Sequence, residues 1–328
     1  MNTFCKSSKT ARALMAGIAL VAGAATVHAQ TYPAKPIRFL IGFPPGGGSD
    51  TMARSVSQKL AESLGRPVVV DNRPGANANI AAELAARSPA DGHTMVLVSA
   101  PHAVSKVLYR SLNYDLERDL APIGLIGAVP HVVIVHPSIP ARSIRELVAL
   151  AKTQREPLTY ASAGVGSTDH IAPEMLSSMA KVKFVHVPYK GAGPAVTDLL
   201  GGHVAMMFAS MPAAVGPVRA GRLRALAVTG AKRAAVMPDL PTIAESGFPG
   251  YELTTWYGVM FPAGTPKEIV ARANSELNRA ISLPDVRERL AAVGAEPLGG
   301  SPDDFAAVIK SDVVKFAKVV KAANIRPE

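Results

Sequence analysis

The chain of 328 residues has little cysteine, few aromatic residues and little charge. Its single cysteine, Cys5, lies near the start, so the rest of the chain cannot form an internal disulfide. Aromatic residues make up 5% of the sequence and charged residues 18%, whereas hydrophobic residues make up 48%. This composition argues against a disulfide-built scaffold and against a disordered chain, and it supplies enough apolar material for large cores.

A hydrophobic run long enough to span a membrane is also lacking. The first 29 residues instead have the features of a secretory signal peptide: a positive start, an uncharged apolar run over Ala13–Thr26, and a cleavage site at Val27–Ala29. No twin-arginine pair is present, and Cys5 precedes the apolar run, where it is not placed for lipidation. We therefore predict a cleaved signal peptide over residues 1–29 and a mature protein in the periplasm.

Clusters of positive charge are missing as well. The formal net charge is +10, and removing Lys6, Lys9 and Arg12 with the signal peptide lowers it to +7, spread along the chain. Nucleic-acid binding usually combines clustered basic residues with aromatic side chains, so we expect no nucleic-acid partner. The dispersed charge indicates either a field that attracts anionic solutes or simply a basic surface.

What the mature chain does have is an alternation of short apolar segments with helical patterns. Strands are predicted over Ile37–Gly42, Pro67–Val70 and Met95–Ser99, and helices over Thr51–Leu64 and Asn79–Arg87. This alternation is typical of a parallel, doubly wound α/β sheet.

A second series of the same kind begins near residue 130. Its predicted strands are Val132–Val135, Leu158–Ala161, Phe184–Val187, Val204–Phe208 and Leu223–Val228. Three helices are predicted in the C-terminal third, over Pro266–Ile281, Pro284–Val293 and Pro302–Ala323, and are expected to pack back on the first series. We predict two domains with a cleft between them: residues 30–129 plus 254–328, and residues 130–253.

Two glycine-rich loops share one design, because Gly46–Asp50 and Gly164–Thr168 each join the end of a strand to the start of a helix. The first N–H groups of a helix lack acceptors and carry partial positive charge, and glycine lets a ligand come close to them. We predict that the loops face each other across the cleft and hold one anion, since ligands of open α/β sheets bind beyond the carboxyl ends of the strands. A tight turn without a ligand is the alternative for each loop.

The loops favour carboxylate over phosphate. Gly48-Ser49-Asp50 lacks the lysine of a phosphate-binding Walker loop, and Gly164-Val165-Gly166 lacks the third glycine of the dinucleotide fingerprint. The carboxyl group of Asp50 would also repel a highly charged phosphate.

Motifs spread in order over the mature chain carry a family resemblance. They include Tyr32–Arg38, Phe43–Gly47, Val69–Ala76, Ser88–Thr94, Tyr160–Gly164, His186–Gly191, Leu223–Thr229, Leu240–Thr242, Pro249–Glu252 and Pro262–Pro266. Together they resemble the Bug (Bordetella uptake gene) family, the periplasmic solute-binding proteins of tripartite tricarboxylate transporters.

The resemblance implies a periplasmic binding protein-like fold of two doubly wound α/β domains. It implies a monomer that holds a small carboxylate in the cleft, mainly through main-chain N–H groups and water, and delivers it to the membrane permease subunits. It implies no enzymatic activity, cofactor or metal. Dicarboxylates, tricarboxylates, amino acids and aromatic carboxylates all fit such a site, and a protein that presents its ligand to a sensory receptor is the alternative.

The loop argument and the resemblance together give an expected set of ligand-binding residues. These are Pro45, Gly46, Gly47, Gly48, Ser49, Asp50, Asn79, Ser99, Ser162, Ala163, Gly164, Gly166, Ser167, Thr168, His170, Tyr189 and Ser210. The backbone N–H groups of Gly47, Gly48, Gly166 and Ser167 are expected to donate to the carboxylate.

Several residues keep two interpretations. Asn77 and Asn79 either contact the ligand or cap the next helix, and Trp256 and Tyr257 either face the ligand or pack in the core between the domains. Asp169 stands in a loop that is often neutral in the family, which implies a changed ligand preference.

Catalysis and metal binding are weakly indicated. Ser167, Asp169 and His170 suggest an exported hydrolase as a distant alternative, but neighbours in sequence do not form a triad unless they converge in space, and no Gly-x-Ser-x-Gly motif is present. The histidines are scattered rather than set at metal-ligand spacing.

Overall fold

The computed structural model describes residues 32–326, so the predicted signal peptide over residues 1–29 lies outside the described residues. The strands form one mixed sheet in the order β2-β1-β3-β9-β4-β7-β5-β6, with β10 and β8 also paired to β4. The strands are β1 (Ile37–Ile41), β2 (Val68–Asn72), β3 (Thr94–Ser99), β4 (Leu120–Val135), β5 (Thr159–Ser162), β6 (Val185–Pro188), β7 (Met206–Ser210), β8 (Arg224–Val228), β9 (Thr254–Pro262) and β10 (Glu296–Gly299).

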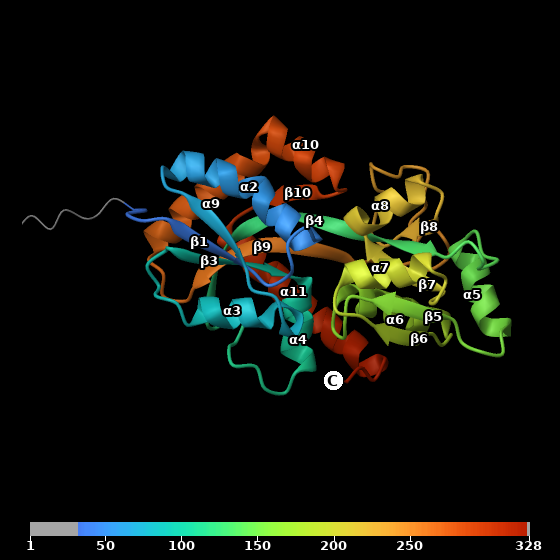
Figure 1. The fold of residues 1–328 in the computed structure, drawn as a ribbon. Helices are drawn as coiled ribbons and strands as arrows, with labels where there is room; N and C mark the ends of the chain where they lie inside the picture. The colour runs from blue at the N-terminus through green and yellow to red at the C-terminus, as the bar shows by residue number, and fades with distance from the viewer. Residues whose placement is uncertain (1–31, 327–328) are drawn as a thin grey trace, which may run out of the picture.

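Helices cover both faces of this sheet, as Figure 1 shows. They are α2 (Gly48–Leu64), α3 (Asn79–Ala86), α4 (Ala100–Leu108), α5 (Ile144–Thr153), α6 (Thr168–Ala180), α7 (Ala192–Leu200), α8 (Met211–Arg219), α9 (Lys267–Ser282), α10 (Pro284–Ala292) and α11 (Pro302–Ala322), with a short 3-10 turn, η1 (Ala76–Ala78), before α3. No helix within residues 32–326 has the length and apolarity needed to cross a membrane.

The long strand β4 joins two groups of strands. Its Leu120–Pro130 part pairs with β9, and its His131–Val135 part pairs with β7, so the partners change at residues 130 and 131. The first strand group is β1, β2, β3, β9 and β10, and the second is β5, β6, β7 and β8 (Figure 1). The change of partners lies at the predicted boundary between the domains, and the division into two domains stays a prediction that this change supports.

The start of β4 differs from the expectation of a strand that begins at Val132. Pro122, Gly124, Gly127 and Pro130 give residues 120–130 the composition of a loop. The pairing with β9 accommodates these residues by shifting register twice, which is the effect of β-bulges. Gly127 is required there, because a Cβ at this position would lie 2.5 Å from the carbonyl oxygen of Glu296 on β10.

The sheet is mixed rather than purely parallel. β1 is parallel to β2 and β3, and β5 is parallel to β6 and β7, which confirms the α/β class and the two repeated series. The connecting strands β4 and β9 are antiparallel to each other and to their other neighbours. They pass between the two strand groups and so form the centre of the molecule.

The core consists of two buried clusters, one on each face of the sheet, and each contains residues of both strand groups. Phe39 of β1 and Met207 of β7 belong to one cluster, whereas their neighbours Leu40 and Phe208 belong to the other. Successive side chains of a strand point to opposite faces, which explains this split. The two strand groups therefore share their hydrophobic cores.

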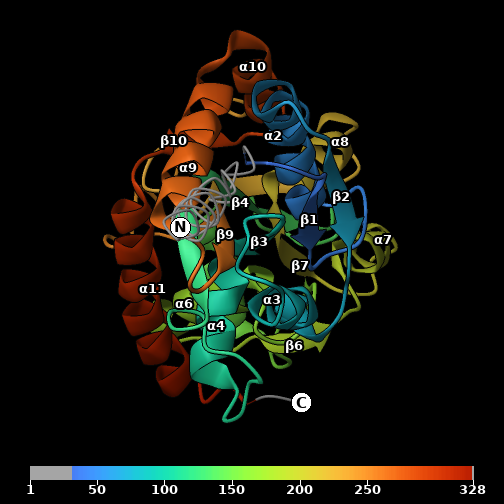
Figure 2. The ribbon, with the colours of Figure 1, turned by 90° about the vertical axis from the view of Figure 1, so that its left-hand side faces the viewer.

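The three C-terminal helices pack mainly on the first strand group, as expected. α9 contacts α2 and β4, and α10 contacts α2 and α9. α11 runs along one side of the molecule (Figure 2) and contacts α4 and β4, but it also reaches α6 beside the second strand group. This last helix therefore ties the two groups together.

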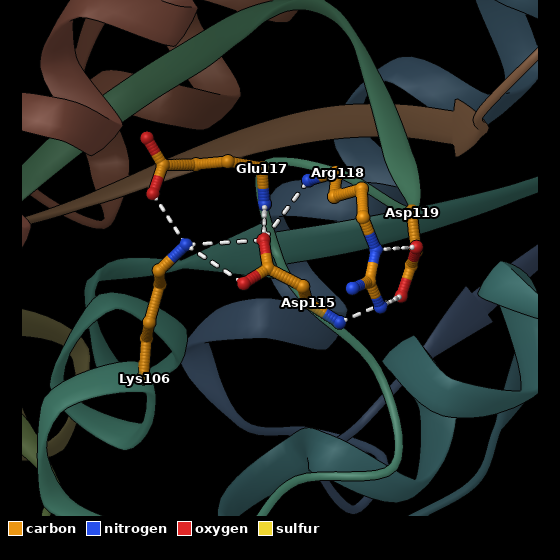
Figure 3. Close-up of polar contacts among 5 residues, drawn as sticks. All are labelled: Lys106, Asp115, Glu117, Arg118 and Asp119. Atoms are coloured by element: carbon orange, nitrogen blue, oxygen red, sulfur yellow. Dashed lines mark hydrogen bonds and ion pairs between the residues drawn. The ribbon is translucent and has the colours of Figure 1, made fainter.

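The connection from α4 to β4 is fixed by charged side chains, shown in Figure 3. Lys106 Nζ lies 3.0 Å from both carboxylate oxygens of Asp115, and Asp115 Oδ1 accepts the N–H groups of Glu117 and Arg118. Arg118 pairs with Asp119, which lowers the pKa of that carboxyl to about 2. This network sets where the chain enters β4.

Candidate functional site

A cleft of about 520 Å³ lies between the two strand groups and is lined from both. Its size is that of a site for a small molecule. Five helices begin at its wall, and the lining includes residues of each start: Gly47–Ser49 at α2, Ser99 and Pro101 at α4, Ser167–Asp169 at α6, Gly191–Pro194 at α7, and Ser210 and Pro212 at α8.

This convergence gives the cleft a positive potential. Each helix start carries partial positive charge on N–H groups that have no acceptor within the helix. Among the described residues that line the cleft, Lys190 and Asp169 are the ones with formally charged side chains, and Lys190 is exposed. The field of the backbone therefore favours an anion, and Asp169 opposes it locally.

The first glycine loop presents free donors to the cleft. Gly47 is the N-cap of α2, and within residues 32–326 the N–H groups of Gly47, Gly48 and Ser49 donate to no protein acceptor. The N–H of Gly46 is already bound to Asp50 Oδ2 at 3.0 Å. Three adjacent N–H groups at a helix start form an anion site.

Asp50 turns away from the cleft and is neutralised by its neighbours. Its carboxylate accepts hydrogen bonds from Arg54 Nε at 2.8 Å and from Asn72 Nδ2 at 3.1 Å. Burial would raise the pKa of Asp50, but the bonds from Arg54, Gly46 and Asn72 outweigh burial and lower it. Asp50 thus stabilises the loop without repelling an anion in front of it.

The second glycine loop differs, because two of its N–H groups already donate to acceptors within the protein. The N–H of Gly166 donates to His170 Nδ1 at 3.2 Å, and the N–H of Ser167 donates to the carbonyl of Gly164 at 3.2 Å. The hydroxyl of Ser167 also donates to that carbonyl. In this structure the N–H groups of Gly166 and Ser167 are thus engaged within the loop, and their contact with the ligand stays a prediction. Among the described residues, the N–H groups of Val165, Thr168 and Asp169 donate to no protein acceptor.

A stack of aromatic rings supports the second loop from behind. The rings of His170 and His186 lie 3.9 Å apart and nearly parallel, and Tyr160 stacks on His186. Ser162 Oγ lies 2.6 Å from His186 Nε2. Burial lowers the pKa of His170 to about 3, with a contribution from His186, and burial lowers that of His186 to about 4. Neutral rings therefore hold the loop in place.

The floor of the cleft is a buried polar network. His131 Nε2 lies 2.9 Å from Asp169 Oδ1 and 3.2 Å from Thr168 Oγ1, and Thr255 Oγ1 donates to Thr168 Oγ1 at 2.9 Å. Burial and the charge of Asp169 raise the pKa of Tyr257, while a hydrogen bond with Ser49 acts in the opposite direction. The phenol therefore stays protonated and lies beside the α2 loop, 3.0 Å from the position of a Cβ on Gly48.

Comparison with known proteins identifies the family at this point. A family model described as the tripartite tricarboxylate transporter family receptor, TctC, matches residues 52–325. The chain belongs to this family. The resemblance to Bug proteins predicted from the sequence is thereby confirmed, and the family consists of solute-binding receptors.

Three solved structures of family type are similar along nearly the whole chain. Rpa4515 of R. palustris, solved with adipate, is 37% identical with a TM-score of 0.85 and covers 90% of this chain and 100% of its own. The periplasmic binding protein BugD is 33% identical with a TM-score of 0.83 and the same coverage. MatC of Rhodopseudomonas palustris, solved with bound malate, is 30% identical with a TM-score of 0.81 and covers 88% of this chain and 100% of its own. The expected periplasmic binding protein-like fold is confirmed.

The structure places ten of the expected ligand-binding residues in the cleft lining. These are Pro45, Gly46, Gly47, Gly48, Ser49, Ser99, Ala163, Ser167, Thr168 and Ser210. The expected residues outside the lining are Asp50, Asn79, Ser162, Gly164, Gly166, His170 and Tyr189.

Three of the expected residues outside the lining shape the walls of the cleft. Gly166 has a φ of +79°, and a Cβ there would lie 3.0 Å from Leu108 of α4, so this glycine faces the opposite wall. The hydroxyl of Tyr189 donates to the carboxylate of Asp198. Gly164, with a φ of +131°, supplies the carbonyl that accepts the bond from Ser167.

Asn77 and Asn79 neither line the cleft nor cap α3. Asn79 Nδ2 donates to the carbonyl of Ala76 at 2.6 Å and to Ser105 Oγ at 3.0 Å, and Asn79 Oδ1 accepts a bond from Tyr114. Ala78 is the N-cap of α3, without a side-chain cap. The capping interpretation is therefore wrong, because Asn79 links the turn before α3 to α4. A contact with the ligand stays a prediction.

The expected set left out several parts of the lining, among them His131, Thr255 and the segment from Ala192 to Pro194. His131 and Thr255 lie on β4 and β9, which connect the two strand groups, so only the strand crossing brings them to the floor. Gly191 and Gly193 at the start of α7 gave a usable signal, since they repeat the pattern of the two glycine loops.

Residues 32–326 neither bring the three residues of the hydrolase alternative together nor place three metal-binding side chains in one group. Ser167 is bonded to Gly164 and His170 to Gly166, whereas Asp169 is bonded to His131, so the three residues of the hydrolase alternative do not converge. In the part of the chain from 32 to 326, no group of three His, Cys, Asp or Glu side chains is placed to hold a metal ion.

Proposed function

We propose that this protein is a periplasmic receptor that captures a small organic carboxylate in its central cleft. It then delivers the ligand to the membrane subunits of a tripartite tricarboxylate transporter. In this proposal the protein acts as a monomer and performs no chemical reaction. Its signal peptide, residues 1–29, directs export to the periplasm and is then cleaved. The features of that segment and the family of solute-binding receptors support the location and the partner.

One observation carries the proposal: five helix starts converge on one cleft, and the loop at α2 leaves three N–H groups free. A carboxylate is compact, carries one charge and accepts several hydrogen bonds, so the N–H groups of Gly47, Gly48 and Ser49 match it. The adipate and malate found in two similar proteins are carboxylates as well, which supports the same ligand class here.

The test is a thermal-shift screen of the purified protein against carboxylates, with amines and sugars of similar size as controls. A ligand that binds the folded state at a concentration of 100 Kd adds about 2.7 kcal/mol to the free energy of unfolding. We expect at least one carboxylate class to raise the melting temperature. A protein that responds only to amines or sugars would contradict the proposal.

Gly47→Val shows whether the α2 loop binds the ligand. Gly47 has a φ of −81°, and the nearest atom to an added Cβ is the carbonyl oxygen of Pro44 at 3.6 Å, so the fold accommodates a side chain. That side chain would cover the N–H groups, and we expect the ligand-induced shift to disappear. Gly216→Ala is the control, because an added Cβ on α8 meets nothing within 4 Å. Its response to ligand should equal that of the wild type.

A further inference from the structure

The two loops of the cleft are not equivalent, because each carries an aspartate that points in a different direction. Asp50 is bound to Arg54 and Asn72 and does not line the cleft. Asp169 lines the cleft at the start of α6 and is only 6% exposed. The α2 loop therefore offers only donors, whereas the α6 loop also offers a carboxylate.

Among residues 32–326, Asp169 bonds one side chain and forms no ion pair with a lysine or arginine. The one side chain that bonds it is His131, through Nε2 at 2.9 Å from Oδ1. His131 Nδ1 is buried and has no hydrogen-bond partner among residues 32–326. The carboxylate of Asp169 is therefore held by one imidazole and by no lysine or arginine of the described residues.

The other oxygen of Asp169 is available to a ligand. In the described part of the chain, Oδ2 accepts no hydrogen bond, and it is not among the buried side-chain atoms that lack a partner. A buried carboxylate requires a donor or a positive charge, and it repels a second carboxylate at short distance. The group of the ligand that meets Asp169 is therefore a donor and not an anion.

We propose that Asp169 selects carboxylates that also carry an ammonium group, so that the ligand is an amino acid rather than a dicarboxylate. This inference rests on the proposed function, since it assumes that the ligand carboxylate occupies the α2 loop. The ammonium group lies against Asp169 Oδ2, and the hydroxyl of Tyr257 lines the cleft beside the α2 loop, 3.0 Å from the position of a Cβ on Gly48.

The experiment compares ligands that share a carbon skeleton. Isothermal titration measures Kd for butanoate, 2-aminobutanoate, 4-aminobutanoate and succinate, and for the corresponding six-carbon set that ends in adipate. In the wild type we expect an amino acid to bind best, and the diacid of the same set to bind about tenfold or more weakly. A diacid that binds as tightly as the best amino acid of its set, or amino acids that do not bind at all, would overturn the assignment.

Asp169→Asn removes the charge and should lower the affinity for the amino acid about tenfold or more, while the affinity for the diacid stays or rises. Asp239→Asn is the matched control, because it makes the same change at an exposed residue outside the cleft and should alter no Kd. If Asp169→Asn does not fold, the affinities of Asp169→Ser for the same ligands and the comparison of amino acid with diacid in the wild type test the role of Asp169. An unchanged ratio of affinities in a folded variant contradicts the role of Asp169.

The outcomes separate this inference from the proposed function. Tight binding of succinate or adipate by the wild type overturns the role of Asp169 but supports a carboxylate receptor. The absence of a response to every carboxylate of the wider screen overturns the proposed function itself.

Discussion

Two adjacent residues of β9, Trp256 and Tyr257, have different roles because successive side chains of a strand point to opposite faces. Trp256 packs edge-on against Phe305 of α11 and donates from Nε1 to Asp312 Oδ2 at 2.7 Å. Tyr257 lines the cleft. The core interpretation therefore holds for the first residue, and the cleft interpretation for the second.

This difference gives a prediction for two matched variants. Tyr257→Phe removes the hydroxyl at the cleft floor, and we expect the affinity for the ligand to fall about three- to tenfold, with a small change in stability. Trp256→Phe removes the partner of a largely buried carboxylate, and we expect the free energy of unfolding to fall by about 1–3 kcal/mol. Urea unfolding and titration with the best-bound carboxylate measure both effects.

Ligand affinity should respond to the first variant and not to the second. Loss of affinity in Trp256→Phe at a temperature where it is folded would show that the two faces of β9 are coupled.

A one-residue offset at a helix start also decides which aspartate faces the ligand. Asp50 is the third residue of α2, and Asp169 is the second residue of α6. One residue turns a helix by about 100°, so similar loops direct their carboxylates differently. The sequence predicted both loops and singled out Asp169, but it did not give the direction of either side chain.

At the scale of elements, the packing of α11 against β9 depends on one glycine. A Cβ at Gly258 would lie 2.3 Å from the ring of Phe305, which is fully buried. The ring thus occupies the space that a side chain at residue 258 would need. The absence of a side chain at this position allows α11 to lie against the central strands.

We expect Gly258→Ala to lower the free energy of unfolding by about 1–3 kcal/mol, because the methyl group overpacks the contact. Adding Phe305→Leu should restore part of the loss, since leucine lacks the ring atoms that clash. Denaturant unfolding of both single variants and the double variant measures the coupling. Strictly additive losses would show that the destabilisation by Gly258→Ala does not arise from a clash with the ring of Phe305.

Element prediction from sequence succeeded where periodic patterns are regular. The predicted Thr51–Leu64 and Pro302–Ala323 helices correspond to α2 and α11 within a few residues. It failed for residues 120–130 of β4, because proline and glycine there indicate a loop unless the partner strand is known. It also failed for the four residues of β10, whose pairing with β4 is remote in sequence.

At the scale of the whole molecule, the stability should depend on pH through buried histidines. Burial lowers the pKa of His102 from its usual 6.5 to about 4, and His102 Nδ1 accepts the N–H of Ser99. The folded state therefore keeps this ring neutral, while the unfolded state protonates it below pH 6.5. The contribution of His102 to the free energy of unfolding is therefore fully present above pH 6.5 and is lost as the pH falls towards 4.

We expect His102→Asn, which keeps an acceptor for Ser99, to lose less stability between pH 7 and pH 5 than the wild type does. The difference amounts to at most about 1.4 kcal/mol per pH unit for one proton. Glu174 and Asp312, whose pKa values are raised, oppose the trend equally in both proteins. Melting curves at several pH values measure this difference, and parallel pH profiles would refute the role of His102.

The sequence by itself determined the α/β class, the repeated strand–loop–helix units, the family and the glycine loops. These properties depend on local periodicity, on helix starts and on short motifs, all of which are encoded by neighbours in the chain. The α2 loop was predicted as an anion site because its donors belong to a few consecutive residues.

Only the tertiary structure decided how these parts meet. The shared cores, the crossing of β4 and β9, and the cleft floor of His131, Asp169, Thr255 and Tyr257 depend on contacts between residues far apart in the chain. The same is true of the donors of Gly166 and Ser167, which a single hydrogen-bonded turn removes from the ligand. Sequence patterns encode which groups exist, whereas packing decides which of them remain free to bind.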